Sequence, residues 1–263
     1  MQNVDNIYIL VILGMVGSFL MVGSFILLYV RNQNKILKQR QQLQFKEIEH
    51  QKELLQAIIE SQETERKRIG QDLHDDVGTA LSSLRLTIEM FKPASEEDNN
   101  NKHVNLSKEI IDKVIRDVRY ISHNLSPPAL SYYGLAAAIE EKASFINNSG
   151  QLTITLVNDA EEALKDISLP AAVALYRVLE ELINNTIKHA GATQSVIKIT
   201  AADNIISITY SDNGKGMDAS SIIVGMGMQN IESRLTVINA GYIIESSAGQ
   251  GFRANINYAI PAN

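Results

Sequence analysis

The feature that most constrains this chain is an uncharged apolar run near its N-terminus. Residues 7–30 read IYILVILGMVGSFLMVGSFILLYV and contain no Asp, Glu, Lys or Arg. As a helix, this run would be about 36 Å long, which is enough to cross a bilayer. The leader before it has no positive charge, and the run is longer than the apolar core of a secretory signal, so a cleaved signal peptide fits poorly. The run therefore predicts a transmembrane helix.

Basic residues predict the orientation of that helix. None precedes the run, whereas Arg31, Lys35, Lys38 and Arg40 follow it closely. The positive-inside rule then places the C-terminal part in the cytoplasm and residues 1–6 outside the cell membrane. A tail of that size cannot form a sensor domain. We therefore expect the signal to reach the chain from the lipid bilayer or from a separate membrane sensor protein.

Composition narrows the chemistry of the remaining chain. The 263 residues are 45% hydrophobic and 21% charged, which is enough for packed domains beside the apolar run. The net charge of −6 gives no reason to expect a nucleic-acid partner. Because the chain has no cysteine, disulfides, thiolate metal sites and cysteine nucleophiles are excluded. The five histidines lie far apart and show no HExxH-type metal spacing.

Residues 31–62 are rich in Gln, Lys and Glu and contain neither Pro nor Gly. This composition favours one long helix. The apolar residues that fit a heptad seam are Leu37, Ile48, Leu55, Ile58 and Ile69. Because Gln and Glu occupy the other seam positions, we expect a weak two-stranded coiled coil. A single solvated helix is the alternative.

A helical hairpin is predicted for residues 63–128. In its first helix, one apolar stripe recurs at spacings of three or four: Ile69, Leu73, Val77, Leu81, Leu84, Ile88 and Phe91. A polar loop follows Pro93, and a second amphipathic helix ends before Pro127 and Pro128. Two such helices alone cannot bury both of their apolar stripes. We therefore expect a homodimer in which two hairpins form a four-helix bundle.

A histidine and a carboxylate lie together in the first helix of the hairpin. His74 follows Leu73, so it sits about 100° around the helix from the stripe, at the edge of any helix contact. Asp75 can hold one ring nitrogen of His74 and leave the other as a nucleophile. Taken alone, the pair also fits a surface histidine among helix charges. His123, in the second helix, has no neighbouring carboxylate in sequence, and we interpret it as structural.

Residues 129–263 alternate between helical and strand patterns. Helices are expected at residues 134–148, 169–189 and 228–239. Strands are expected at residues 152–157, 195–200, 205–211, 242–246 and 252–258. This irregular mixture predicts an α/β sandwich with helices on one face of a sheet. The expected fold class of the whole chain is therefore α plus α/β.

Two glycine clusters in this C-terminal part suggest a phosphate-bearing ligand. The first cluster, DNGKG, follows a strand and contains Asp212, Gly214 and Gly216. The second, GMGM, opens a helix and contains Gly225, Gly227 and Met228. Glycine lets the backbone approach a ligand, and a helix N-terminus favours phosphate. A plain tight turn is the alternative for either cluster.

The helix before the glycine clusters carries a polar face. Glu181, Asn185 and Lys188 recur at i, i+4 and i+7 and so share that face. A carboxylate, an amide oxygen and an ammonium group together suit a hard cation and phosphates. A solvated polar face is the alternative reading. Asn184, one residue away, is expected to point elsewhere.

Together these residues resemble the sensor histidine kinases, in the branch that includes nitrate-sensing and desaturase-regulating kinases. The resemblance covers about residues 62–261. ERKRIGQDLHD, at residues 65–75, is similar to the phosphoacceptor box. SPPAL followed by GLAAAI looks like the passage into the ATP domain. EELINNTIKH is similar to the N box, and DNGKG and GMGM look like the first two glycine boxes.

The resemblance implies a protein-histidine kinase that uses ATP and Mg²⁺. It implies that His74 is the phosphoacceptor, that Asp75 stabilises its imidazole, and that Glu181 supports the metal or its water. It also implies that Asn185 ligates Mg²⁺ and that Asp212 accepts a hydrogen bond from the adenine amino group. The other ATP-binding residues that it implies are Lys188, His189, Gly214, Gly216, Gly225, Gly227 and Met228.

The resemblance further implies a two-component partner and a mobile part. The phosphoryl group would pass to an aspartate of a cognate response regulator, and residues 217–227 would form a mobile lid. Thr79 stands where this branch usually has Gln, which positions water to dephosphorylate the regulator. A hydroxyl there can still hold water, over a shorter reach.

The expected organisation has five parts in chain order. They are an outer tail at residues 1–6, a membrane span at 7–30, a coiled coil at 31–62, a dimerisation and phosphotransfer domain at 63–128, and an ATP-binding domain at 129–263. Two rival functions stay open from the sequence. One is a nucleotide-binding signalling scaffold, and the other is an ATPase of the gyrase and chaperone superfamily without histidine phosphotransfer.

Overall fold

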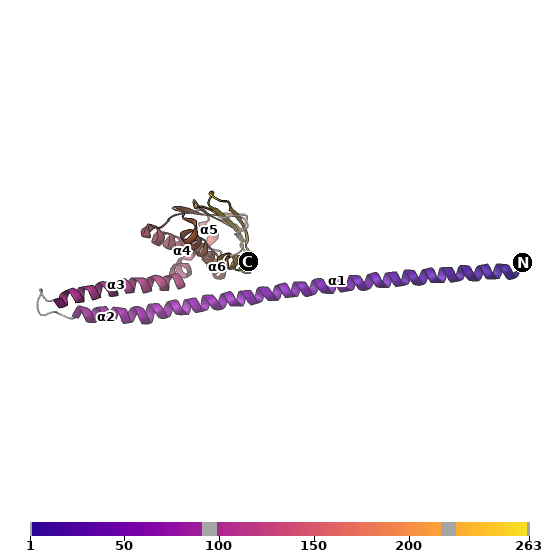
Figure 1. Cartoon of the computed structure of the whole chain (residues 1–263), viewed down its shortest axis with the longest axis horizontal. Coiled ribbons are helices and arrows are strands. Elements are labelled where there is room, and N and C mark those ends of the chain that lie inside the picture. The colour runs from indigo at the N-terminus through magenta and orange to yellow at the C-terminus, as the bar shows by residue number, and fades with distance from the viewer. Residues whose placement is uncertain (1, 91–98, 217–224, 262–263) are drawn as a thin grey trace. The chain divides into compact units, whose positions relative to one another are not determined.

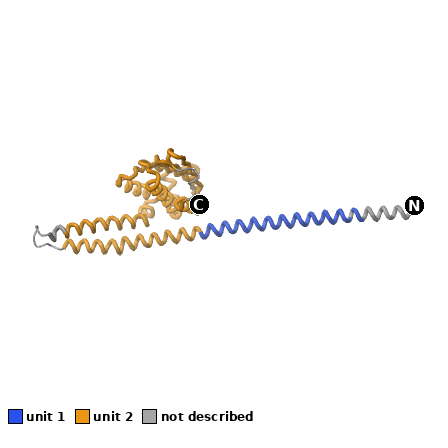
Figure 2. The backbone as a smooth tube through the Cα atoms, in the orientation of Figure 1, with its two compact units in different colours: residues 1–54 blue, residues 55–263 orange. Residues whose placement is uncertain are grey.

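The structure is a computed structural model that describes residues 2–90, 99–216 and 225–261, and the side chains of these except at residues 2–13, 16 and 99–102. The chain divides into two compact units, residues 1–54 and residues 55–263 (Figure 2). The elements before the sheet domain are α1 (Gln2–Asp72), the π-helical turn η1 (Leu73–Val77), α2 (Gly78–Met90) and α3 (Asn99–Leu125) (Figure 1).

The N-terminal residues are helical, as the sequence predicts for residues 7–30 and 31–62, and both ranges belong to α1. The expected membrane span is not supported. Among the residues whose side chains are described, no helix has both the length and the apolar character needed to cross a bilayer. Positions 7–13 and 16 of the expected span lie outside those residues.

The helical hairpin in the second unit is confirmed for its described residues. Arg85 on α2 donates to Asp112 on α3, with Nε 3.0 Å from Oδ1. Further along, Ser122 Oγ on α3 donates to the Gly70 carbonyl at 2.6 Å. Gly70 is buried against α3, so closely that an added Cβ would lie 3.2 Å from the Ser122 carbonyl oxygen. The expected loop after Pro93 lies outside the described residues.

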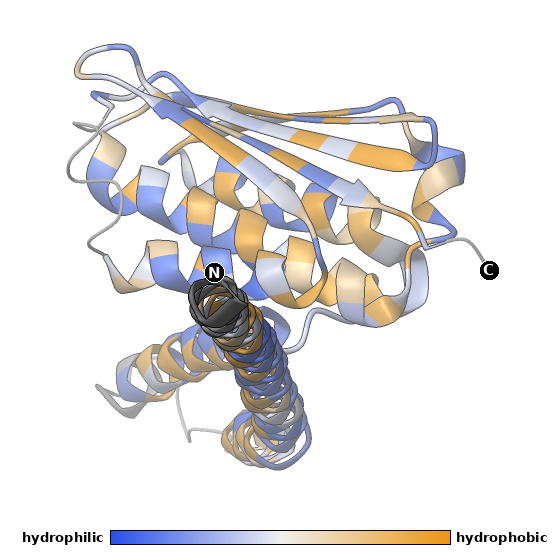
Figure 3. Cartoon of the chain, turned by 90° about the vertical axis from the view of Figure 1, so that its right-hand side faces the viewer, coloured by the Kyte–Doolittle hydropathy of each residue, from blue (hydrophilic) through white to orange (hydrophobic). Residues whose placement is uncertain are grey.

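The C-terminal part is the expected α/β sandwich. Its elements are α4 (Pro128–Ser149), β1 (Thr153–Asn158), α5 (Glu161–Leu164), α6 (Leu169–Asn185), the π-helical turn η2 (Thr186–Ala190), β2 (Gln194–Ala202), β3 (Ile205–Asp212), α7 (Met226–Val237), β4 (Gly241–Ser246) and β5 (Phe252–Ala259). In the described residues, the strands form one sheet in the order β1-β2-β3-β5-β4. β1 and β2 are parallel, and the other neighbours are antiparallel. Figure 3 shows the helices on one face of this sheet.

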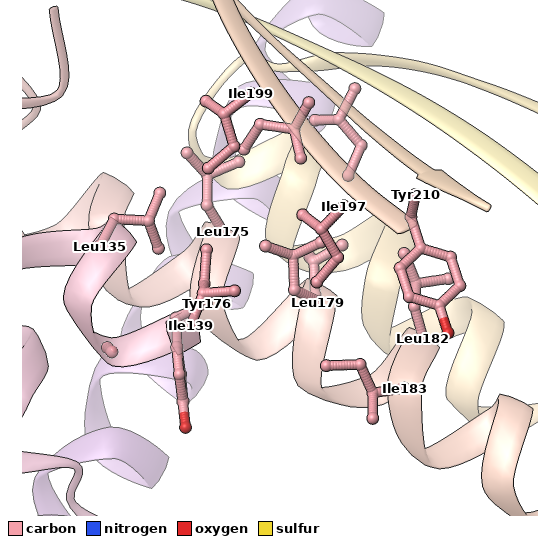
Figure 4. Close-up of a cluster of buried hydrophobic side chains, with 14 of the residues drawn as sticks. Leu135, Ile139, Leu175, Tyr176, Leu179, Leu182, Ile183, Ile197, Ile199 and Tyr210 are labelled. Carbon is pink, nitrogen blue, oxygen red and sulfur yellow. The ribbon is translucent and has the colours of Figure 1, made fainter. Parts of the chain in front are cut away.

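Helix α6 connects the two parallel strands and packs under the sheet. A parallel pair needs such a crossover connection, which explains why α6 lies between β1 and β2 in the chain. Pro170 stands in its first turn, where the missing backbone donor costs nothing. Leu175 and Leu179 are fully buried and lie opposite Ile197 and Ile199 of β2 (Figure 4). These contacts make α6 the centre of the hydrophobic core.

Four local features differ from the sequence expectation. Helix α4 begins earlier, at Pro128, and contains a kink at Gly134, whose φ of 84° suits glycine. The short helix α5 was not expected. The two helices that carry the polar motifs each include a π-helical turn, at Leu73–Val77 and Thr186–Ala190, where uniform α-helix was expected. Such turns differ from α-helix only by a shifted backbone hydrogen bond, so side-chain periodicity hardly reveals them.

A cluster of buried and partly buried charged side chains joins the helical hairpin to the sheet domain. We call it the charge cluster: Glu63, Lys142, Arg177, Glu180 and Arg234. Glu63 on α1 accepts from Arg177 Nη2 at 3.0 Å and from Arg234 Nη1 at 2.9 Å. Glu180 accepts from Arg177 Nη1 at 2.9 Å and from Lys142 Nζ at 3.1 Å. Two carboxylates thus hold three cations that come from α4, α6 and α7.

The charge cluster also caps the end of α3. Arg177 donates to the carbonyls of Asn124 and Leu125, at 3.0 and 2.6 Å. These carbonyls belong to the last turn of α3, where helix carbonyls have no partner within the helix. Burial opposes charge on Arg177, but Glu63 and Glu180 outweigh it and hold the pKa of Arg177 above its ordinary value. Burial lowers the pKa of Arg234, and the nearby Glu63 carboxylate offsets this lowering only in part.

The charge cluster generates a stability prediction. Glu63→Ala removes the carboxylate that pairs with Arg234, whereas Arg177 keeps Glu180. An uncompensated buried charge costs about 3 kcal/mol. We expect the thermal unfolding temperature of the purified chain, measured by circular dichroism, to fall clearly. Glu65→Ala is the matched control, since Glu65 is an exposed carboxylate on the same helix that pairs with Arg68. Equal unfolding temperatures for the two variants would contradict the role of Glu63.

Candidate functional site

A cavity of about 410 Å³ opens where β3 ends, between α6 with η2 and the start of α7. This is within the usual size of small-molecule sites. Its lining brings together three separate motifs of the sequence. The lining residues are Glu181, Leu182, Asn185, Thr186, Lys188, His189, Ala190, Asp212, Lys215, Gly216, Gly225, Met226, Gly227, Met228 and Phe252.

Asp212 lies at the end of β3, between Ser195 of β2 and Phe252 of β5 in the sheet register. Its carboxylate is held on both oxygens. The Gly214 N–H donates to Oδ1 and the Thr186 hydroxyl donates to Oδ2, each at 2.9 Å. The orientation of this carboxylate is therefore fixed by the protein.

The loop after Asp212 is tied down by its neighbours. Asn213 Oδ1 accepts from the Thr193 and Gln194 N–H groups, at 2.9 and 3.0 Å. The Lys215 N–H donates to the Ala190 carbonyl at 2.9 Å. The strand end and the end of η2 thus form one wall of the cavity.

Two glycines around the cavity lie very close to neighbouring atoms. Gly216 has a φ of 66°, and a Cβ there would collide with the Ser247 carbonyl oxygen. A Cβ at Gly227 would collide with the Glu181 carboxylate and lie 3.4 Å from Asn185 Nδ2. The second glycine cluster therefore lies directly against the polar face of α6. The plain-turn alternative does not account for this convergence on one cavity.

The polar face of α6 and η2 lines the cavity as expected. Glu181 and Asn185 are half-buried, whereas Lys188 and His189 on η2 are exposed at its mouth. Asn184 is not among the described residues that line it and instead borders a different depression, beside α3 and α4. The solvated-face alternative is thus too simple. Of the expected lid, residues 217–224 lie outside the described residues.

Helix α7 presents its N-terminus to the cavity. Its N-cap is Gly225, and residues 225–228 all line the cavity. The first backbone N–H groups of a helix have no partner within it, and the helix dipole favours negative charge there. The cavity therefore combines an oriented carboxylate, the Lys188 ammonium group and a helix N-terminus. This arrangement suits a ligand that has both N–H donors and an anionic group.

His74 lies in the turn η1, outside that cavity's lining. Its Nδ1 is 2.9 Å from Asp75 Oδ1, and both side chains are exposed. Because a carboxylate only accepts hydrogen bonds, Nδ1 is the donor in this contact, and in the neutral imidazole Nε2 is then the nitrogen with the lone pair. Thr79 is exposed near the start of α2. A second histidine of α3, His123, does have a carboxylate neighbour, since its Nδ1 lies 3.5 Å from Glu141 Oε1 on α4.

Sequence reasoning missed residues that the structure brings to the site. Thr186, next to Asn185, is buried and holds Asp212. Tyr210, behind it on β3, contacts the Phe252 ring edge-on, with ring centroids 6.5 Å apart. For Thr186, the sequence does offer one signal: it is a polar residue on the side of its helix that is otherwise apolar and therefore expected to be buried. Tyr210 and Phe252 gave none, because aromatic residues are ordinary in strands.

Two family descriptions match separate parts of the chain. Residues 65–130, which contain His74, match the family described as "Histidine kinase". Residues 171–256, which contain the cavity lining, match the family described as "Histidine kinase-, DNA gyrase B-, and HSP90-like ATPase".

The chain is also similar to curated proteins. It is 29% identical over 252 residues to the sensor histidine kinase MctS of Rhizobium johnstonii, with 93% of this chain and 52% of that protein aligned. It is 30% identical over 224 residues to the sensor histidine kinase ComP of Bacillus subtilis, with 78% of this chain and 27% of that protein aligned. The chain therefore spans about half or less of the length of these relatives.

Among solved structures, a blue-light activated histidine kinase of Erythrobacter litoralis is similar at 17% identity and a TM-score of 0.45, over 73% of this chain and 60% of that one. The two family matches and the curated relatives agree with one another. The chain belongs to the sensor histidine kinases whose ATPase domain is of the histidine kinase, DNA gyrase B and HSP90 type.

Proposed function

We propose that this chain is a protein-histidine kinase that phosphorylates itself on His74 from Mg-ATP and passes the phosphoryl group to an aspartate of a response regulator. The observation that carries the proposal is the His74–Asp75 pair, in which Nδ1 is held at 2.9 Å and Nε2 is left exposed. The same chain contains a cavity suited to a nucleotide. Autophosphorylation requires a residue that accepts the phosphoryl group and a site that binds the phosphoryl donor, ATP, in the same polypeptide.

His74 Nε2 is the proposed nucleophile toward the terminal phosphorus of ATP. As the N–P bond forms and the bond from phosphorus to the ADP oxygen breaks, positive charge develops on the imidazole. The Asp75 carboxylate stabilises that charge through the Nδ1–H hydrogen bond. Because both side chains are exposed, the nucleotide-bearing domain can reach His74 without displacing packed residues.

The cavity fits a nucleotide in three ways. The oriented carboxylate of Asp212 can accept a hydrogen bond from the adenine amino group. The N-terminus of α7, with Gly225, Gly227 and Met228, offers backbone N–H groups for phosphates. Lys188 and His189, at the mouth, can neutralise phosphate charge. Gly214 and Gly216 let the loop after Asp212 pack closely against Ala190 and Ser247, which shapes this wall of the cavity.

A magnesium ion would be held by Asn185 and by the phosphates, with Glu181 supporting the ion or its water. Mg²⁺ commonly binds in this way, through few protein ligands together with phosphate oxygens. When bound, the ion neutralises the charge that develops between the phosphates. Glu181 and Asn185 both lie next to Gly227, beside the N-terminus of α7 that is proposed to bind the phosphates.

The hairpin supports the proposal of a homodimer. Its apolar stripe is exposed in the single chain at Val77, Leu84, Ile110 and Ile121. Exposed apolar residues at helical spacing indicate a surface that another helix covers. Two hairpins would form the four-helix bundle and the coiled coil at residues 31–62 would continue from it. Residues 63–128 are then the dimerisation and phosphotransfer domain, and residues 129–263 are the ATP-binding domain.

The proposed membrane attachment rests on the sequence. Residues 7–30 contain no charged side chain, and basic residues follow them. The N-terminus would lie outside and the kinase domains in the cytoplasm. The signal would come from the bilayer or from a separate membrane sensor. Thr79 is the proposed holder of the water that dephosphorylates the regulator.

The kinase proposal is tested with γ-labelled ATP and Mg²⁺ on the purified full chain. We expect label that is acid-labile and alkali-stable, as a phosphorus–nitrogen bond is. His74→Gln should abolish it, because the nucleophile is gone. His123→Gln is the matched control, since that histidine is also exposed and also beside a carboxylate. Label that survives in His74→Gln would remove His74 as the acceptor.

The nucleotide site is tested in the same assay with neighbouring asparagines. Asn185→Ala should reduce the rate of labelling at least about a hundredfold, because one group that supports the transferring phosphoryl is lost. Asn184→Ala, which does not touch the cavity, should label normally. Steady ATP hydrolysis without label would instead indicate an ATPase, and ATP binding with neither outcome would indicate a signalling scaffold.

Membrane attachment is tested by fractionation of cells that express the chain. We expect the wild-type chain to stay in the membrane pellet after an alkaline wash. Leu20→Lys with Phe25→Lys should move it to the supernatant, because each lysine near the centre of a span costs about 3 kcal/mol. Leu43→Lys is the control, since it adds charge outside residues 7–30. Equal pelleting of both variants would contradict a span there.

A further inference from the structure

Behind the cavity, three side chains form a hydrogen-bonded series between η2 and β3. The Tyr210 hydroxyl lies 2.6 Å from Thr186 Oγ1, and Thr186 Oγ1 lies 2.9 Å from Asp212 Oδ2. Thr186 is 3% exposed and Tyr210 is fully buried. Buried hydroxyls need partners, and here each supplies one for the next.

The series has a single direction. A carboxylate accepts hydrogen bonds only, so the one hydroxyl proton of Thr186 goes to Asp212. Thr186 Oγ1 must then accept from the Tyr210 hydroxyl. Burial raises the pKa of Tyr210 to about 12, so the phenol keeps its proton at neutral pH. Tyr210 therefore donates to Thr186, and Thr186 donates to Asp212.

The opposite oxygen of the carboxylate is held independently. The Gly214 N–H donates to Asp212 Oδ1 at 2.9 Å. With one donor on each oxygen, the carboxylate cannot turn about its Cβ–Cγ bond without losing a hydrogen bond. The donor on Oδ1 is a backbone N–H, so it does not depend on a side chain at position 214. The donor on Oδ2 is the Thr186 hydroxyl, so it depends on that side chain.

We propose that Thr186 is a positioning residue that orients the Asp212 carboxylate toward the amino group of adenine. The inference rests on the proposed ATP site. Thr186 acts through Asp212, and its neighbour Asn185 serves the phosphate end of the same cavity. The α-to-π transition falls between these two residues, since α6 ends at Asn185 and η2 begins at Thr186. Consecutive residues thereby serve the two ends of one ligand.

The test is equilibrium binding of two nucleotides to the purified full chain with Mg²⁺. One is ATP, and the other is purine riboside triphosphate, which lacks the 6-amino group. Thr186→Val keeps the side-chain shape and removes the hydroxyl. We expect it to weaken ATP binding about tenfold, the size expected for one hydrogen bond to a charged group. Binding of the purine analogue should not change, so the preference for ATP should disappear.

Conservative variants separate positioning from structural damage. Thr186→Ser restores the hydroxyl and should return ATP affinity to within about twofold of wild type. Tyr210→Phe removes the donor behind Thr186 and should weaken ATP binding by a smaller factor, about threefold. If Thr186→Val does not fold, Tyr210→Phe serves as the test variant in its place. Thr209→Val is the matched control, because the Thr209 hydroxyl bonds to Asn255 at 3.0 Å, and Thr209 is not among the residues that line the cavity.

The outcomes distinguish the two proposals. If wild type binds ATP and Thr186→Val keeps the wild-type preference over the purine analogue, the role of Thr186 is overturned and the ATP site stands. Equal weakening of both nucleotides, or failure of Thr186→Ser to restore ATP affinity, also overturns it. If wild type binds neither nucleotide, the proposed ATP site itself fails and the inference fails with it. Unfolding temperatures without nucleotide identify any variant that is simply unfolded.

Discussion

The packing of α6 against the sheet is the interaction on which the rest of the structure depends. The helix buries Leu175, Leu179, Leu182 and Ile183 under β2 and β3, so its axial position and rotation are fixed. Its polar residues are then placed as a consequence. In the middle of the helix, Arg177 and Glu180 belong to the charge cluster that joins the helical hairpin to the sheet domain. At its end, Glu181 and Asn185 face the cavity. One apolar stripe thus supports both the contact between the hairpin and the sheet domain and the proposed nucleotide site.

In the described residues, one π-helical turn contains the proposed phosphoacceptor and the other contains residues of the proposed nucleotide site. η1 contains His74 and Asp75, and η2 contains Thr186, Lys188 and His189. Such turns often occur at functional sites, because a widened turn redirects the side chains that follow it. In η2 the consequence is visible in the contacts. Thr186 turns inward to Asp212, while Lys188 and His189 stay at the mouth of the cavity. Elsewhere, α6 keeps the regular period that its packing needs.

Much of the fold was predictable because its signals are local. The strands and helices of residues 129–263 follow their periodicity, and the glycine clusters mark the wall of the cavity. The His74–Asp75 contact was predictable because the residues are adjacent in sequence. The charge cluster was not, since Glu63 meets Arg177 and Arg234 only through tertiary packing. The parallel pairing of β1 with β2 was missed for the same reason. The role of Thr186 depends on a partner on another element, and the carboxylate near His123 comes from α4.

The central claim is that the His74–Asp75 geometry makes Nε2 the phosphoryl acceptor. ³¹P nuclear magnetic resonance of the autophosphorylated chain at alkaline pH tests it most directly, because the two ring positions of phosphohistidine have distinct chemical shifts. The account predicts one signal, from phosphorus on Nε2 of His74, since Nδ1–H is engaged by Asp75 at 2.9 Å. A signal from phosphorus on Nδ1, or one that persists in His74→Gln, would contradict it.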